Sequence, residues 1–181
     1  MLFIDGNQAS HVTFGYSLRS TSALGTFDAE LPVVRERDFL SGRSYIFGVP
    51  ILPIIEQLAD GPARLTGYAT RSRIRVYDAD NTGTLAVHLR VFFGYSGDGM
   101  PVVLYERDIV VNQRDFDDPS YPYYGELDLP NGCSPGHSTA NPCLSFDDLG
   151  VQITPNTNAR YWAFVSTTDN TTGQVRIRHP Q

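Results

Sequence analysis

Polar and apolar residues alternate most regularly in the middle of this chain. Arg73–Tyr77 alternates polar with apolar side chains, and Leu85–Val91 does the same. Because the turn-forming segment Asp78–Gly83 lies between them, the pattern predicts a β-hairpin. A second turn at Phe92–Gly99 and a further strand over Val102–Val111 extend this hairpin into a predicted meander.

The C-terminus repeats the pattern. Tyr161–Val165 and Gln174–Arg178 flank the turn segment Thr167–Gly173, which predicts a second hairpin. Three more segments are typical of strands: Val12–Leu18, Ser44–Val49 and Gly150–Thr154. Apart from the last of these, the chain from residue 115 to residue 158 is rich in proline and polar residues and is predicted to be loop.

One segment carries the signals of a helix, Ile54–Ala59. Pro53 stands before it, where proline suits the first helical turn, and Gly61 follows it, where glycine suits a helix end. A helix of this length is predicted to be a short connector.

Many strands without alternating long helices exclude a parallel α/β sheet. The sequence therefore predicts an all-β fold, an antiparallel β-sandwich of the immunoglobulin-like or jelly-roll type, with long polar loops and at most one short helix. No internal repeat or linker divides the chain, so residues 1–181 are interpreted as a single domain. Residues 1–10 are expected to form an extended N-terminal arm, and its apolar residues are Leu2, Phe3 and Ile4. Docking of this arm on the edge strand of a neighbouring copy is the preferred interpretation, and docking on its own sandwich is the alternative.

The composition indicates a globular protein and argues against nucleic-acid binding and membrane insertion. An apolar fraction of 41% and a charged fraction of 19% in 181 residues indicate a globular chain with a sizeable core. The net charge is −6, and all 14 basic residues are arginine, the cation best suited to protein interfaces. A spread of arginines on an acidic chain argues against nucleic acid as a partner. No apolar run approaches the roughly 20 residues that span a bilayer, so membrane insertion is not expected.

The two cysteines lie in one polar loop. Cys133 and Cys143 are separated by a stretch rich in proline, glycine and serine, with almost nothing apolar to bury a thiol. A disulfide between them is the preferred interpretation, and it would indicate an oxidising compartment. Zinc is the alternative, because His137 lies between the cysteines, but a fourth ligand at a known spacing is missing.

The sequence predicts no cofactor, although it leaves calcium open at two acidic places. The Asp78–Gly83 turn places oxygen-bearing side chains on alternate residues and a glycine at the sixth position, but the twelfth position, where calcium loops carry glutamate, is Leu89. A plain turn is the preferred alternative. A second acidic cluster, Asp115, Asp117 and Asp118, lies before Glu126 and Asp128. A solvated loop is its preferred interpretation, and a calcium site is the alternative. The candidate ligands in the two places are Asp78, Asp80, Asp115, Asp117 and Asp118.

Three tyrosines are the candidate contact residues. Tyr121, Tyr123 and Tyr124 stand on a loop stiffened by Pro119 and Pro122. Exposed tyrosines of this kind stack on sugar rings or on a protein neighbour. The alternative is that they fold back over the sandwich.

No arrangement of residues indicates catalysis. The four histidines are scattered, and there is no nucleophile elbow or phosphate-binding glycine loop. The chain is therefore predicted not to be an enzyme. The preferred hypothesis is a structural or assembly protein, a subunit of an extracellular filament, cell-surface layer or virion exterior, whose partners are copies of itself or other surface subunits. The alternative is a secreted carbohydrate-binding module that uses the tyrosine loop.

Overall fold

The computed structural model describes residues 16–22, 25–31, 34–56, 64–95, 97–114, 122–129 and 146–181. Within these ranges the chain forms strands and one short 3₁₀ helix, η1. Their bounds are β1 (Tyr16–Ser22), β2 (Gly25–Leu31), η1 (Glu36–Asp38), β3 (Ser44–Ile51), β4 (Pro53–Glu56), β5 (Arg64–Tyr68), β6 (Thr70–Asp78), β7 (Ala86–Tyr95), β8 (Pro101–Val110), β9 (Tyr124–Asp128), β10 (Phe146–Pro155), β11 (Tyr161–Asp169) and β12 (Val175–Arg178).

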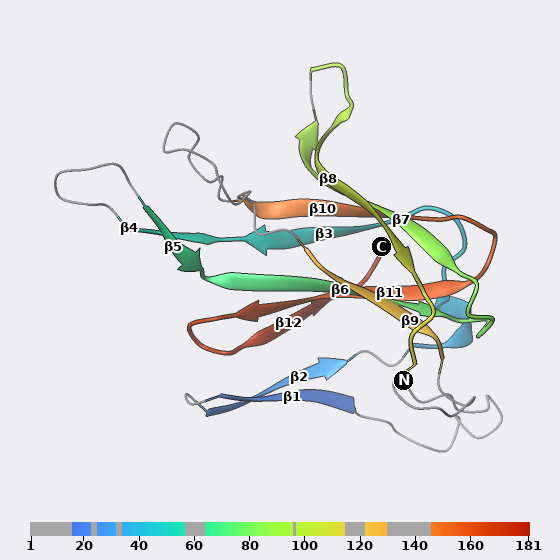
Figure 1. Cartoon of the computed structure of the whole chain (residues 1–181), viewed down its shortest axis with the longest axis horizontal. Helices are drawn as coiled ribbons and strands as arrows, with labels where there is room; N and C mark the ends of the chain where they lie inside the picture. The colour runs from blue at the N-terminus through green and yellow to red at the C-terminus, as the bar shows by residue number, and fades with distance from the viewer. Residues whose placement is uncertain are drawn as a thin grey trace.

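Two four-stranded antiparallel sheets face each other across the core (Figure 1). The first sheet has the order β3-β10-β7-β8, and the second has the order β12-β11-β6-β9. The prediction of an all-β, antiparallel sandwich-like fold is therefore confirmed. Two further hairpins, β1–β2 and β4–β5, form two-stranded sheets of their own.

The core is built from the alternate residues of strands in both sheets. Ile46 and Leu89 from the first sheet and Val76 and Val165 from the second are all fully buried in one apolar cluster. Burying a side chain of this size stabilises the fold by about 1.5–3 kcal/mol. The alternation read from the sequence thus reports the inward and outward faces of these strands.

The β7–β8 and β11–β12 hairpins agree with the sequence prediction. The strand predicted at Gly150–Thr154 is also present, as the longer β10. Of the strand predicted at Val12–Leu18, the described part, from Tyr16 onward, belongs to β1, which pairs with β2.

The predicted hairpin between β6 and β7 is wrong. β6 pairs with β11 and β9, whereas β7 pairs with β10 and β8, so the two strands lie in opposite sheets. The meander predicted from them is wrong for the same reason. Alternation shows that each strand buries one face, but it does not show which strand lies alongside it. The connection through Asp78–Gly83 crosses from one sheet to the other instead of turning back.

The predicted helix at Ile54–Ala59 is also contradicted where the structure describes it. Pro53–Glu56 is the strand β4, and Ile54 pairs with Gly67 of β5. Two adjacent β-branched isoleucines favour an extended backbone, and so short an apolar run does not distinguish helix from strand. Residues 57–63 lie outside the described part of the chain.

The strand β9 lies in the segment predicted to be loop, where proline on both sides hid its short pattern.

Backbone contacts join the two sheets along both sides of the sandwich. On one side Gln113 and Tyr124 exchange backbone hydrogen bonds of 2.9 and 2.8 Å, and Gly125 of β9 lies against Ile109 of β8. On the other side the Gln181 amide donates to the Tyr45 carbonyl of β3 at 3.1 Å.

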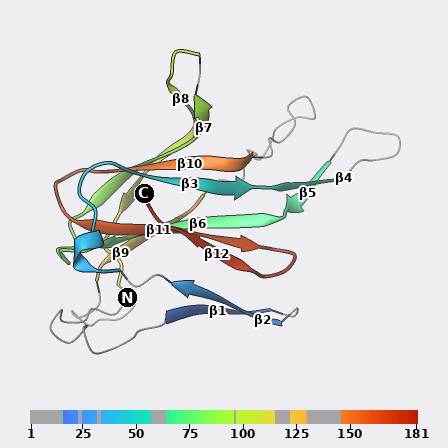
Figure 2. The same ribbon diagram turned by 180° about the vertical axis from the view of Figure 1, so that it is seen from behind.

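Two hairpins, β4–β5 and β7–β8, extend beyond the sandwich (Figure 1). In Figure 1 the β4–β5 ribbon extends to the left of the strands that it continues, and the end of the β7–β8 hairpin extends upward. Figure 2 shows both projections from behind. β2 lies beside β12, at the edge of the second sheet.

Candidate functional site

The outer face of the second sheet carries aromatic residues at one end and arginines at the other. Since Ile74 and Val76 of β6 face the core, their neighbours on the strand face outward. The antiparallel register places three outward residues in each row across β11, β6 and β9. The rows are Trp162–Tyr77–Tyr124, Phe164–Arg75–Glu126 and Ser166–Arg73–Asp128.

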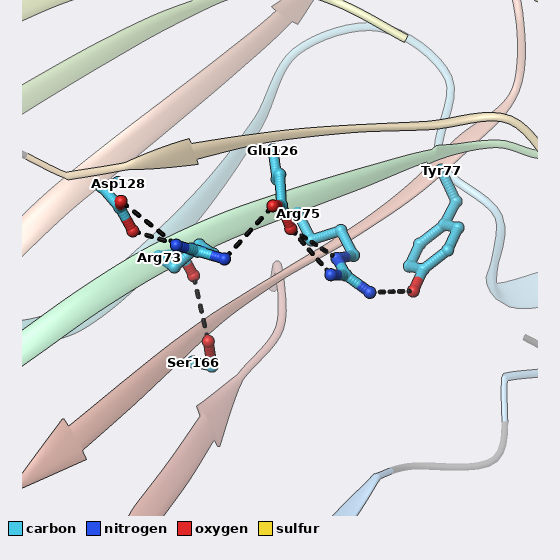
Figure 3. A network of polar contacts seen from close by, with 6 residues as sticks. All are labelled: Arg73, Arg75, Tyr77, Glu126, Asp128 and Ser166. Atoms are coloured by element: carbon cyan, nitrogen blue, oxygen red, sulfur yellow. Dashed lines mark hydrogen bonds and ion pairs between the residues drawn. The ribbon is translucent and has the colours of Figure 1, made fainter. Parts of the chain in front are cut away.

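Two of these rows form an arginine ladder, made of Arg73, Arg75, Glu126 and Asp128 (Figure 3). Arg73 donates to both oxygens of Asp128, at 2.7 and 3.1 Å, and reaches Glu126 at 3.2 Å. Arg75 donates twice to one oxygen of Glu126, at 3.1 and 2.7 Å. Glu126 therefore bridges the two arginines, and the ladder fastens the edge strand β9 to β6.

The ladder shifts the pKa values of Arg73, Arg75 and Asp128. The hydrogen bond from Arg73 lowers the pKa of Asp128, and the same bond raises the pKa of Arg73. Burial opposes the charge on Arg75, but hydrogen bonds with the Tyr77 hydroxyl and with Glu126 outweigh burial and raise the pKa of its guanidinium. The charged forms of these three side chains are thus stabilised by their hydrogen-bond partners.

The aromatic end of this face is covered by the chain itself. Tyr77, Trp162 and Phe164 are 6%, 7% and 4% exposed, and Val34 and Phe39 pack against them. Trp162 therefore belongs to a second, smaller apolar cluster on the outside of the sheet.

A small groove lies at the arginine end. Its volume is about 190 Å³, and the described residues that line it come from β6 and β11. They are Arg71, Arg73, Arg75, Phe164, Ser166 and Thr168. The groove thus combines guanidinium and hydroxyl groups over an aromatic floor.

The outer face of the first sheet carries an apolar row, defined here as Phe47, Phe92 and Val103. Phe92 pairs with Val103 across β7 and β8, and its ring lies 6.2 Å from the ring of Phe47 on β3. The two rings meet across β10 because Gly150 has no side chain there, and a Cβ at this position would overlap the Phe92 ring. The apolar row therefore spans the whole sheet.

The side chains at both ends of the apolar row are exposed to solvent. Phe47 is 45% exposed and Val103 is 40% exposed, whereas Phe92 between them is buried. Leu104, an extra residue at a β-bulge beside Val103, is 38% exposed. Large apolar side chains are thus gathered on the outward face of this sheet.

Charged pairs occupy the next rows of the same face. Arg90 of β7 pairs with Glu106 of β8, and His88 of β7 lies 2.8 Å from Asp108 of β8. Each row holds one basic and one acidic residue, so this part of the face carries both signs of charge.

The turn proposed as half a calcium site is held by its own hydrogen bonds. Asp78 is fully buried, and its carboxylate accepts bonds from the amides of Asp80, Thr82 and Gly83 and from the Thr82 hydroxyl, at 2.8–3.1 Å. Asp80 instead accepts from the backbone amide and side chain of Arg160, which lower the pKa of Asp80. These bonds account for the turn without an ion, and calcium binding stays a hypothesis.

The structure places two of the three predicted tyrosines against the protein. Tyr123 packs on the main core, and the guanidinium of Arg114 lies 3.8 Å from its ring centroid. Tyr124 lies in β9, 6.1 Å from the ring of Tyr77. The alternative in which the tyrosines fold back over the sandwich therefore describes Tyr123 and Tyr124.

The remaining candidate residues lie outside the described part of the chain, so their predicted roles stay predictions. They are Leu2, Phe3, Ile4, Asp115, Asp117, Asp118, Tyr121, Cys133 and Cys143. Among the described acids, Glu126 and Asp128 neutralise arginines of the ladder. Within the described ranges no group of three or more histidine, cysteine or acidic side chains is placed to hold a metal ion.

Sequence reasoning did not single out the arginine groove or the apolar row. Both left a signal, because Arg73 and Arg75 stand at alternate positions of one predicted strand and Arg71 continues this spacing before it. Tyr45 and Phe47 likewise flank the buried Ile46. Outward residues of one strand become a surface only when the strands beside it are known.

None of the helices that the structure describes is long and apolar enough to cross a membrane. Comparison of the chain with protein-family models, curated proteins and solved structures finds no match.

Proposed function

We propose that this protein is a non-enzymatic structural subunit that associates with copies of itself through the outer face of its first sheet. The observation that supports this proposal is the apolar row, which crosses the full width of the sheet and ends in Phe47 and Val103, each about two-fifths exposed or more. Outward faces of antiparallel sheets are ordinarily polar, because they meet water. A second protein surface would remove this row from water.

A second copy suits this surface better than an unrelated partner does. A two-fold axis parallel to the strands would place each row of one copy opposite the same row of the other. Phe47 of one copy would then meet Val103 of the other, and apolar side chains would face apolar side chains. In the next row Arg90 of one copy would face Gln152 of the other, and Glu106 would face Tyr45, so no like charges would meet.

The size of the face is consistent with a stable contact. Four strands about 4.8 Å apart and about ten residues long make a face of roughly 650 Å². A standard protein interface buries about 800 Å² per partner. The projecting β4–β5 hairpin adds to this surface, and Ile54 of β4 is 44% exposed. Because an isolated two-stranded hairpin is only marginally stable in water, β4–β5 would gain stability from a neighbour.

Sedimentation velocity over a concentration series tests the proposal. The wild-type protein should associate with rising concentration, and Phe47→Ser should weaken association by about thirtyfold, since an interface anchor is worth about 2 kcal/mol or more. Met100→Ser is the matched control, because Met100 is 61% exposed but lies at the hairpin turn, outside the apolar row. Its association should equal that of the wild type. A protein that stays monomeric, or a Phe47→Ser variant that associates normally, would refute self-association through this face.

Carbohydrate binding is the second candidate function, and one observation favours it. The rings of Tyr45 and Phe47 lie parallel, 5.9 Å apart with an interplanar angle of 9°, on an exposed sheet surface. Paired aromatic rings are suited to stacking on sugars, and Gln152 and Arg90 in the adjoining row supply polar groups. A monomer that binds a glycan array, and loses this binding in Phe47→Ser, would favour the carbohydrate module over the assembly subunit.

The proposed setting of the subunit is outside the cell or on a virion exterior. It is supported by the predicted disulfide between Cys133 and Cys143, because disulfides persist in oxidising surroundings.

A further inference from the structure

We propose that the groove at the end of the arginine ladder binds a carboxylate group, with Arg71 as its principal ligand and the Thr168 hydroxyl beside it. This site lies on the second sheet, so it is independent of the self-association proposed for the first.

The proposal rests first on an arginine that the ladder leaves without an acid. Arg73 is paired with Asp128 and Arg75 with Glu126, each across from β9. β9 ends at Asp128, so the row of Arg71 has no residue of β9 opposite it. Within the described part of the chain Arg71 forms no ion pair, although its charge helps to lower the pKa of Asp128.

Hydroxyl groups line the other side of the groove. Thr168 is the cross-strand neighbour of Arg71, and Ser166 is the neighbour of Arg73 on the same outward face of β11. The Thr168 hydroxyl is able to donate one hydrogen bond to a bound oxygen, whereas the Ser166 hydroxyl donates its hydrogen to the Arg73 backbone carbonyl at 3.4 Å (Figure 3). A guanidinium fork with one hydroxyl donor beside it suits the two oxygens of a carboxylate.

Charge favours a carboxylate over a doubly charged phosphate. The three arginines of the groove carry three positive charges, and Glu126 and Asp128 offset two of them. One carboxylate balances the charge that remains, whereas a phosphate dianion would leave an excess negative charge near Asp128. A volume of about 190 Å³ is below the roughly 300–1,000 Å³ of pockets for drug-sized ligands, so the occupant is a small group.

Two sources supply this chemistry, the acidic side chain of a protein neighbour and the carboxylate of a uronic acid sugar. The test follows the side-chain Nε–H signals of Arg71 and Arg73 by NMR during titration with sodium acetate, N-acetylaspartate amide or sodium glucuronate. Sodium chloride at the same ionic strength is the salt control. Saturable shifts with a dissociation constant on the order of 1 mM are expected for the carboxylates and none for chloride. Tighter binding of glucuronate than of the aspartate derivative indicates the sugar source, and the reverse order indicates the protein source.

Variants separate this site from general charge attraction. Arg71→Gln should weaken carboxylate binding about tenfold or more, because it removes a charge-assisted hydrogen bond. Arg176→Gln makes the same change of charge on the neighbouring strand β12, but Arg176 pairs with the inward-facing Thr167, so binding should be unchanged. Shifts that do not saturate, that chloride reproduces, or that survive Arg71→Gln would overturn the proposal. Loss of binding in both variants would overturn it too, since only net charge would then matter.

Discussion

Two glycines mark the places where side chains approach the backbone most closely. At Gly125, where β9 meets β8, an added Cβ would lie 2.5 Å from Ile109 Cγ2 and 2.8 Å from the Val110 carbonyl oxygen. At Gly150 it would meet the Phe92 ring that completes the apolar row. The two positions differ in consequence, because Gly125 joins the sheets whereas Gly150 shapes an outer face.

Gly125→Ala should therefore destabilise the fold by about 1–3 kcal/mol, the usual cost of adding a methyl group to a packed site. Urea unfolding measures this change as a lower midpoint. Gly97→Ala is the control, because no atom lies within 4 Å of the added Cβ and the variant should stay within about 1 kcal/mol of the wild type. Equal midpoints for the two variants would show that the β8–β9 contact is looser than described.

Charged residues at strand edges make the fold sensitive to acid. The pKa of Asp128 is lowered by Arg73, and the pKa of Asp169 is lowered by the amides of Thr172 and Thr171 in the β11–β12 turn. A pKa that is lower in the folded state contributes stability above the unfolded value of about 3.9, and this stability is lost as the pH falls toward the folded value. The β9 and β12 edges should thus weaken together in acid.

The urea midpoint of the wild-type protein should accordingly fall as the pH drops from about 5 to about 2. Asp128→Asn should start from a lower midpoint at pH 6 and lose less of it in acid, since it already lacks this ion pair. Arg71, Arg73 and Arg75 keep their charge over the whole range, so the carboxylates set the slope. A wild-type midpoint that does not change between pH 5 and pH 2 would contradict this assignment.

At the scale of elements, the sequence predicted strands better than it predicted their partners. Alternation around Ile74 and Leu89 revealed the buried face of β6 and β7, because burial acts on each strand separately. Their placement in opposite sheets depends on a turn held by Asp78, a buried carboxylate whose bonds to the loop amides are invisible to a pattern of polar and apolar residues. The arginine groove was unpredictable for a related reason, since it needs the register of β6 with β11.

At the scale of the whole molecule, the outer faces of the two sheets differ in how much of their apolar and charged surface the chain itself covers or neutralises. The second sheet covers its aromatic end with the chain around Phe39 and neutralises Arg73 and Arg75 with acids of β9. The first sheet leaves Phe47 and Val103 uncovered in the described structure. This asymmetry is the reason for assigning self-association to the first sheet and ligand binding to the second.

Photo-cross-linking from position 47 identifies the surface that covers the apolar row, and it therefore tests self-association through the first sheet. Replacing Phe47 with p-benzoylphenylalanine keeps an aromatic ring in place and captures whatever lies against it. Covalent dimers are expected, with cross-linked peptides from β8 of the second copy and with Val103 or Leu104 among the attachment points. Cross-links confined to the same chain, or dimers joined through residues of the second sheet, would contradict self-association through the first sheet.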